Sequence, residues 1–221
     1  MRDIYRYERK FILSNQTIPE LENLLRNSKF NFKKNYPTRK VNSIYFDDYN
    51  ANSVLDNLDG NNFKNKVRLR WYGKKKLINS PTLELKNKNG YVNYKKIYKI
   101  KNFQPTKFTK KNVDFMMKEL FYKYNFLKKK IAISSTHYDR LYFISSRNNI
   151  RATLDFNINY FNIHNHSNYN LNKYSKSFII EIKYPNEKDE YVRTKLENIT
   201  LRVSKNSKYI NSLIEYPIKL I

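Results

Sequence analysis

The most regular feature of the sequence is a series of short segments in which apolar and polar side chains alternate. Successive side chains of a β-strand point to opposite faces, so this period of two predicts strands with one apolar face. Residues 67–71 (VRLRW) show the pattern clearly, and Asn89-Gly90 is the strongest short hairpin signal. Strands are expected at residues 6–11, 41–46, 64–72, 82–87, 91–100, 131–145, 150–158 and 178–184.

Helical signals lie between these strands. Thr17-Ile18-Pro19-Glu20 has the pattern of a capping box with an early proline, which predicts a short helix through about Arg26. A stripe of apolar side chains at helical spacing predicts a second helix over residues 111–124. Further helices are expected at residues 49–58, 188–198 and 207–215, and the polar residues 162–175 are expected to form a loop.

This order of elements predicts an α+β fold. Strands dominate, tight hairpins join them, and helices are interspersed, so an antiparallel β-barrel with helices packed outside fits best. Hydrophobic residues make up 40% of the chain and aromatic residues 16%, which is enough to fill a sizeable core. The sequence has no linker, repeat or Pro/Ser-rich boundary, so a single domain over residues 1–221 is expected.

Composition adds a strong charge asymmetry. The chain carries 44 Lys and Arg against 19 Asp and Glu, a formal net charge of +25. Such a surplus indicates a polyanionic partner, which is nucleic acid, an acidic membrane surface or phosphates. A composition rich in Asn, Lys, Ile and Tyr also produces surface lysines without any ligand, so the positions of the charges must decide.

Scarce residue types narrow the range of sites. The chain has three glycines and no Gly-rich phosphate-loop motif, and it has no cysteine for a disulfide or a thiolate metal site. The amino-terminal residues lack the apolar region of a signal peptide, and no apolar run is long enough to span a bilayer. We therefore expect a cytoplasmic protein without a membrane segment of its own.

The charges recur on one face of the expected strands. In residues 67–71, Arg68 and Arg70 share a face, and Trp71 lies on the other. One explanation is a polar face turned to water. If the sheet closes, the charged faces instead line a tunnel suited to a polyanion. The same alternation groups Arg6, Glu8 and Lys10, then Glu84 and Lys86, Arg151 and Asp155, and Glu181 and Lys183, and it separates Arg140 from its neighbours Asp139 and Leu141.

Phosphate chemistry explains this mixture of charges. Arginine binds two phosphate oxygens with its planar fork, and lysine acts as a point charge. Carboxylates repel phosphate, so their role is either to hold a divalent cation that bridges phosphate oxygens or to neutralise neighbouring cations. Glu8, Glu84, Asp155 and Glu181 are the candidates for these two roles.

Five strings in order resemble a known family. They are residues 7–11 (YERKF), 68–73 (RLRWYG), 83–86 (LELK), 180–183 (IEIK) and 207–209 (SKY). Together they are similar to the VTC domain of the vacuolar transporter chaperone polyphosphate polymerases, a member of the triphosphate tunnel metalloenzyme superfamily. The resemblance runs from Tyr5 to about Ser212. It implies an eight-stranded antiparallel tunnel that transfers the terminal phosphoryl of ATP to inorganic polyphosphate, with pyrophosphate or polyphosphate as partner.

The resemblance also implies roles for particular residues. A divalent metal, Mn²⁺ or alternatively Mg²⁺, would be held by Glu181 together with Glu8. The hairpin register leaves open which of Lys95 and Lys96 faces the tunnel. The catalytic cations implied are Lys10, Arg68, Arg70, Lys86, Arg140 and Arg151, and the substrate-binding ones are Lys95 or Lys96, Lys183, Lys205 and Lys208.

Two positions depart from the family pattern. Arg6 stands where the wider superfamily often has a glutamate, which disfavours a simple two-metal triphosphatase, and Asn206 stands where an aromatic residue is common. The alternatives are a metal-dependent tripolyphosphatase or nucleoside triphosphatase of the same fold, and a non-catalytic polyphosphate-binding module. Nucleic acid is not expected as a partner, because the strand-centred Arg and Glu pattern differs from a stacking surface. A membrane protein partner stays open.

Overall fold

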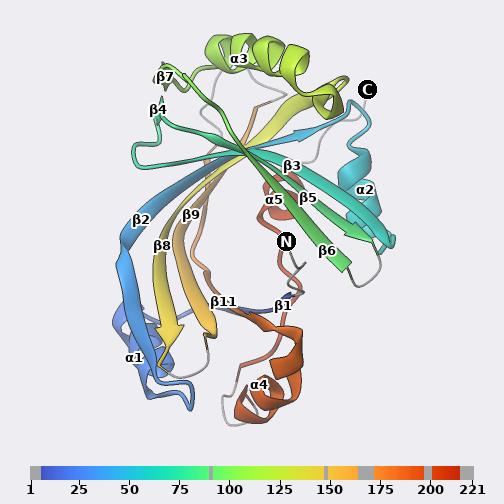
Figure 1. Ribbon diagram of the computed structural model, residues 1–221. Coiled ribbons are helices and arrows are strands. Elements are labelled where there is room, and N and C mark those ends of the chain that lie inside the picture. The colour runs from blue at the N-terminus through green and yellow to red at the C-terminus, as the bar shows by residue number, and fades with distance from the viewer. Residues whose placement is uncertain (1–5, 90–91, 147–148, 164–171, 197–200, 215–221) are drawn as a thin grey trace. The chain divides into compact units, whose positions relative to one another are not determined.

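Long antiparallel strands and short helices make up the computed structural model (Figure 1). It describes residues 6–89, 92–146, 149–163, 172–196 and 201–214. The strands are β1 Arg6–Leu13, β2 Phe32–Asp47, β3 Phe63–Tyr72, β4 Leu77–Ile78, β5 Thr82–Asn89, β6 Val92–Lys99, β7 Thr106–Lys107, β8 Ile131–Ser145, β9 Arg151–Asn162, β10 Asn172–Ser175 and β11 Phe178–Pro185. The α-helices are α1 Ile18–Asn27, α2 Asn52–Leu58, α3 Lys110–Lys123, α4 Asp189–Leu196 and α5 Lys208–Ile214, and Asn125–Leu127 and Asn186–Lys188 are 3₁₀ turns.

The strands follow one hydrogen-bonded order, β1-β11-β9-β8-β2-β3-β5-β6, with β10 paired to β9. Strands β4 and β7 form a separate pair. The antiparallel α+β class expected from the sequence is therefore confirmed. The closed eight-stranded tunnel stays a prediction, because the order among the described residues ends at β1 and β6.

The chain divides into two compact units, and each is described by itself. Unit one comprises Met1–Arg39, Asp139–Ile158 and Ser175–Asn206, and unit two comprises Lys40–Tyr138, Asn159–Tyr174 and Ser207–Ile221. Strands β2, β8 and β9 contribute residues to both units. The single domain expected from the sequence stays a prediction.

In unit one, helices α1 and α4 pack their apolar side chains against one face of the sheet. Leu21 and Leu25 of α1 and Val192 of α4 join Leu154 of β9 and Ile180 of β11 in a buried core. The expected capping box starts α1: the Thr17 amide donates to Glu20 Oε2 at 2.7 Å, and the Glu20 amide donates to Thr17 Oγ1 at 3.5 Å. The alternation of β9 and β11 therefore leaves their charged side chains on the face away from this core.

In unit two, α3 covers the apolar face of β3 and β5 (Figure 1). Trp71 of β3 is fully buried, and its indole Nε1 donates to the Lys74 carbonyl at 3.2 Å. Met116 and Met117 of α3 pack in the same core as Trp71 and Leu83. The apolar half of each strand is thereby removed from water, and the stripe that predicts α3 in the sequence is the buried one.

Three differences from the sequence expectation concern β-structure. Strand β2 begins at Phe32 and not near residue 41. The sequence pattern missed its first half because residues 33–40 are exposed on both faces and show no apolar alternation. Strand β10 lies within the expected loop at residues 162–175, of which residues 164–171 lie outside the described part. The short pair β4–β7 was not expected. Strands β5 and β6 pair as the expected hairpin, and its turn residues 90–91 also lie outside the described part.

Candidate functional site

Strand β3 in unit two carries a line of cations on one face. Lys64, Lys66, Arg68 and Arg70 alternate with side chains of the opposite face, of which Trp71 is buried in the core. Arg70 is itself buried, with an exposed fraction of 7%. Lys64 and Lys66 were missed by the sequence interpretation, although extending the period of two from Arg68 identifies both.

The register of β3, β5 and β6 sets three lysines side by side. Lys66 lies opposite Lys86, and Lys86 lies opposite Lys95. Directly opposed side chains of like charge destabilise a sheet. A row of three lysines across neighbouring strands therefore favours an anionic ligand at this face.

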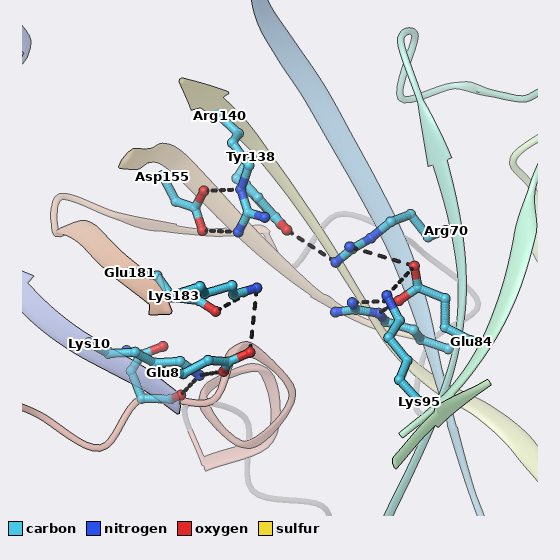
Figure 2. A network of polar contacts seen from close by, with 12 residues as sticks. Glu8, Lys10, Arg70, Glu84, Lys95, Tyr138, Arg140, Asp155, Glu181 and Lys183 are labelled. Carbon is cyan, nitrogen blue, oxygen red and sulfur yellow. Dashed lines mark hydrogen bonds and ion pairs between the residues drawn. The ribbon is translucent and has the colours of Figure 1, made fainter. Parts of the chain in front are cut away.

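Next to this row, one carboxylate is surrounded by three cations (Figure 2). Glu84 Oε2 lies 2.5 Å from Arg68 Nη2, and Glu84 Oε1 lies 3.8 Å from Arg70 Nη1 and 3.1 Å from Lys95 Nζ. We call Arg68, Arg70, Glu84 and Lys95 the basic cluster. Its net charge is positive even with Glu84 ionised.

The pKa values in the basic cluster follow from this crowding. Burial alone would raise the pKa of Glu84, but Arg68, Arg70 and Lys95 outweigh it and lower the pKa to about 2. Burial, together with the charges of Arg68 and Arg70, lowers the pKa of Lys95 to about 8 despite the attraction of Glu84. Burial also opposes the charged form of Arg68, yet Glu84 raises its pKa above the ordinary value. Lys95 is thus a cation that titrates near neutral pH.

Two neighbouring strands fix the orientation of Arg70. Its Nη2 donates to the Tyr138 hydroxyl of β8 at 3.3 Å, and its Nε donates to Ser43 Oγ of β2 at 3.5 Å. Tyr138 was not singled out in the sequence, because alternation treats tyrosine as an apolar residue. Period two from Arg140 nevertheless places Tyr138 on the charged face of β8.

The Ser-Lys-Tyr segment that starts helix α5 contacts three strands of unit two. Lys66 Nζ of β3 donates to Ser207 Oγ at 3.0 Å, and Lys208 Nζ lies 4.7 Å from the centre of the Tyr138 ring. The Tyr209 hydroxyl donates to buried Asp47, which raises the pKa of Tyr209 through burial first and then the aspartate charge. The expected substrate-binding Lys208 is therefore held against the charged side of the sheet.

Unit one carries a charged face with a different balance. On β1 and β11, Glu8 lies opposite Lys183, and Lys10 lies opposite Glu181. Lys183 Nζ lies 3.4 Å from Glu8 Oε1 and 2.9 Å from Glu181 Oε1, and Lys10 Nζ lies 3.7 Å from Glu8 Oε2 (Figure 2). We call these four residues the mixed cluster. Burial alone would lower the pKa of Lys183, but Glu181 and Glu8 raise it above the ordinary value.

Strands β8 and β9 extend this face. Arg140 donates to Asp155 through Nε at 2.5 Å and Nη2 at 2.7 Å, a two-bonded pair in which the carboxylate is fully buried. Arg151 is exposed and lies opposite Lys183. Of the two explanations left open for Asp155, the contacts favour neutralisation of a neighbouring cation. The same holds for Glu84 in the basic cluster.

Carboxylates of the mixed cluster fit a divalent cation. Among the described residues no group of three or more His, Cys, Asp or Glu side chains gathers in one place. Glu8 and Glu181 nevertheless converge on one positive group, the Lys183 ammonium. Mg²⁺-like ions are commonly held by one or two carboxylates, with substrate phosphates and water completing the shell. Two converging carboxylates satisfy that requirement.

The structure brings most of the expected site residues onto two charged faces, one in each unit. Lys95 shares its face with Glu84 and Lys86, whereas Lys96 lies opposite Leu85 on the other face. Lys205 is exposed on a segment that runs beside β1. There the Ser204 amide donates to the Lys10 carbonyl at 2.8 Å. Lys10 Nζ also donates to the Asn206 carbonyl at 3.0 Å. The catalytic and binding roles of all these residues stay predictions.

Histidine contributes little to either face. His137 is buried among Trp71, Phe108 and Phe161, and burial lowers its pKa to about 3. It is therefore neutral at physiological pH and suits a packing role. His164 and His166 lie outside the described residues.

Comparison with known proteins gives one family and a set of similar structures. The VTC domain model matches residues 5–215. A crystal structure of a candidate adenylate cyclase from Vibrio parahaemolyticus has a TM-score of 0.53 at 11% identity, with 96% of this chain and 100% of that one covered. A candidate adenylate cyclase from Bacillus halodurans has a TM-score of 0.51 at 14% identity, with coverage of 94% and 97%. At these identities the likeness concerns the fold alone.

No curated protein matches this chain. Among the described residues, no helix has the length and apolar character needed to cross a membrane.

Proposed function

This chain belongs to the VTC domain family, and from that premise we propose that it is a polyphosphate polymerase that extends inorganic polyphosphate with the terminal phosphoryl group of ATP. The observation that carries the proposal is the row Lys66, Lys86 and Lys95 beside the basic cluster. Such a concentration of opposed cations is stabilised by a ligand with closely spaced negative charges, and a triphosphate or a phosphate chain is such a ligand.

In the proposed reaction, a terminal oxygen of the acceptor phosphate attacks the γ-phosphorus of ATP. The bond between this phosphorus and the β–γ bridging oxygen breaks, and ADP leaves with the electron pair. The acceptor oxygen is already ionised, so the reaction requires no general base, in agreement with the neutral, buried His137. Catalysis then depends on positioning and on charge stabilisation.

The basic cluster supplies the phosphate contacts in this proposal. Arg68 and Arg70 bind oxygens of the triphosphate, and Lys95 adds a cation from the neighbouring strand. Glu84 fixes the arginine side chains before the ligand arrives, as its contacts to Arg68 at 2.5 and 2.7 Å indicate. Such preorganisation reduces the cost of ordering long side chains on binding.

The mixed cluster supplies the metal site in this proposal. Glu181 and Glu8 would hold a divalent cation, Mn²⁺ or Mg²⁺, which would supply Lewis-acid stabilisation of negative charge. Lys183 and Lys10 lie next to these carboxylates and neutralise them while no cation is bound. The closed tunnel expected from the sequence belongs to the same proposal, and so does a location in the cytoplasm.

The proposal is tested by incubating the purified protein with ATP and Mn²⁺ and separating the products on a gel stained for polyphosphate. Free phosphate is assayed in parallel, and a metal-free sample and a Lys10→Ala variant are run beside it. A metal-dependent ladder of polymer that the variant loses is the expected result. Free phosphate without polymer would instead identify a triphosphatase, and neither product would leave a binding module.

A further inference from the structure

A fully buried carboxylate, Asp47, ends strand β2 in unit two, and none of the five motif strings includes it. Asp47 Oδ1 accepts hydrogen bonds from the amides of Asp48 at 3.0 Å and Ser53 at 3.2 Å, and Oδ2 accepts one from the Tyr209 hydroxyl. Lys130 Nζ lies 3.9 Å from Oδ1. A buried carboxylate is costly unless its oxygens are bonded in this way, so these contacts fix both the charge and the orientation of Asp47.

Asp47 connects the starts of two helices. Oδ1 bonds to Ser53 in the first turn of α2, and Oδ2 bonds to Tyr209 in the first turn of α5. The Tyr209 ring also stacks on Tyr45 of β2, with ring centroids 5.0 Å apart and an interplanar angle of 24°. Burial first, and then the Asp47 charge, raises the pKa of Tyr209, so its hydroxyl keeps its proton and stays a donor. Tyr209 is thereby attached to β2 through both its ring and its hydroxyl.

Helix α5 depends on such contacts because it is short. It has seven residues, and isolated helices of this length are marginal in water, so contacts with the rest of unit two hold it. Leu213 packs in the same buried cluster as Tyr209, and Ser212 Oγ lies 2.7 Å from Ser134 Oγ of β8. Both of these contacts lie in the second half of the helix. Tyr209 directly follows Lys208 and holds the end of the helix at which Lys208 lies.

Lys208 is connected to the basic cluster through one side chain. Its Nζ lies 4.7 Å from the centre of the Tyr138 ring, and the Tyr138 hydroxyl accepts a hydrogen bond from Arg70 Nη2 at 3.3 Å. A shift of the first turn of α5 would therefore move the Lys208 ammonium relative to Arg70. The bond from Tyr209 to Asp47 opposes that shift.

We propose that Asp47 is a positioning residue for phosphate binding, which holds Lys208 beside the basic cluster through Tyr209. This proposal rests on the proposed function, in which Lys208 contacts phosphate groups. The charge of Asp47 repels an anionic ligand, so electrostatics alone predicts tighter phosphate binding when that charge is removed. Positioning predicts the opposite sign, and the two roles are therefore separable by experiment.

The test is a double-mutant cycle in which tripolyphosphate binding is measured by isothermal titration calorimetry. Asp47→Asn leaves one acceptor oxygen where the carboxylate uses both, Lys208→Gln removes the ammonium, and the double variant combines the two changes. The matched control is Asp48→Asn, which removes the neighbouring carboxylate, whose Oδ1 accepts the Asn52 amide at 3.0 Å. Tyr209→Phe removes the hydroxyl and keeps both the ring and the charge of Asp47.

We expect Lys208→Gln to weaken tripolyphosphate binding by about tenfold, the equivalent of one charge-assisted hydrogen bond. Asp47→Asn should weaken it by about fivefold and Tyr209→Phe by about threefold, within the range of one hydrogen bond. Asp48→Asn should bind at least as tightly as the wild type. The double variant should bind within about twofold of Lys208→Gln, because Asp47 acts through Lys208.

Two results would overturn the proposal. Additive losses in the double variant would show that Asp47 does not act through Lys208, and so would an Asp47→Asn affinity equal to that of Asp48→Asn. Partial unfolding lowers the number of binding sites per molecule and not the affinity of the folded molecules, so the titration separates it from positioning. If Asp47→Asn does not fold, Tyr209→Phe with and without Lys208→Gln completes the same cycle.

These binding measurements are independent of polymer synthesis. A protein that makes no polymer, but shows the non-additive cycle, would contradict the polymerase and retain the positioning role of Asp47. A protein that makes polymer, and in which Asp47→Asn binds tripolyphosphate as Asp48→Asn does, would retain the polymerase and exclude that role.

Discussion

The two charged faces of the protein use the same residue types in different proportions. In unit one, the carboxylates of the mixed cluster alternate with its lysines, and Arg140 is bound by Asp155. In unit two, Glu84 alone serves the cations of the basic cluster, and the row Lys66, Lys86 and Lys95 lies beside it. A balanced face suits a divalent cation, whereas a face with surplus positive charge suits an anionic ligand. Under the proposed function, we therefore expect metal binding in unit one and phosphate binding in unit two.

Removing the one carboxylate of the basic cluster should have the largest effect. Because the pKa of Glu84 falls to about 2, its ionisation stabilises the fold above the ordinary glutamate pKa of about 4.5, and this contribution is lost as the pH falls toward 2. Glu84→Gln should lower the free energy of unfolding by about 3 kcal/mol at neutral pH. The difference from wild type should shrink in acid, as urea denaturation at several pH values can measure. An unchanged free energy of unfolding in Glu84→Gln would contradict a stabilising role for the ion pairs of Glu84 with Arg68, Arg70 and Lys95.

Arg68→Gln should have the next largest effect, on phosphate binding. The substitution removes a guanidinium that offers two charge-assisted hydrogen bonds to a ligand, so tripolyphosphate affinity should fall by about 100-fold. Arg26→Gln on the exposed last turn of α1 removes the same charge elsewhere and serves as the control. Calorimetric titration of both variants checks this, and equal affinities would remove the basic cluster from the binding site.

Glu181→Gln should separate the metal role of unit one from the phosphate role of unit two. Loss of partners that merely support a metal ligand costs about 10–100-fold in affinity, so loss of a ligating carboxylate should cost at least about tenfold. Mn²⁺ binding, followed by electron paramagnetic resonance of the free ion, should weaken in Glu181→Gln and stay unchanged in Glu84→Gln. Weaker Mn²⁺ binding in Glu84→Gln, with unchanged binding in Glu181→Gln, would place the metal site in unit two instead of unit one.

The smallest expected effect is a pH dependence carried by Lys95. With its pKa lowered to about 8, Lys95 loses its charge as the pH rises through that value, and triphosphate binding should weaken several-fold between about pH 7 and about pH 9. Lys95→Arg keeps the charge throughout and should flatten the profile. Binding of tripolyphosphate across this range is the measurement, and an identical decline in the variant would trace the pH dependence to another group.

Alternation predicted the charged faces well because it is a local property of a strand. It grouped Arg68 with Arg70 and Glu181 with Lys183, and the register confirms that each pair shares a face. It could not choose between Lys95 and Lys96, since that choice depends on pairing with β5. The local pattern determines which side chains of a strand share a face, and pairing with neighbouring strands determines which groups that face meets.

Other features were missed for physical reasons of the same kind. The first half of β2 has no buried face, so it shows no apolar period and was not predicted as a strand. Tyr138 was not singled out in the sequence, although its hydroxyl accepts a hydrogen bond from Arg70. The pairing of Arg140 with Asp155 joins residues of two strands, and sequence gives no direct sign of it.

The most direct test of the proposed polymerase activity follows where the terminal phosphorus of ATP goes. Phosphorus-31 magnetic resonance of the wild-type protein with ATP and Mg²⁺ distinguishes orthophosphate from the interior phosphates of a chain. We expect interior-chain phosphate to accumulate in step with ADP while orthophosphate stays low. Glu181→Gln and Arg68→Gln should both abolish the interior-chain signal. Orthophosphate released in step with ADP, with no interior-chain signal, would contradict the polymerase and identify water as the acceptor.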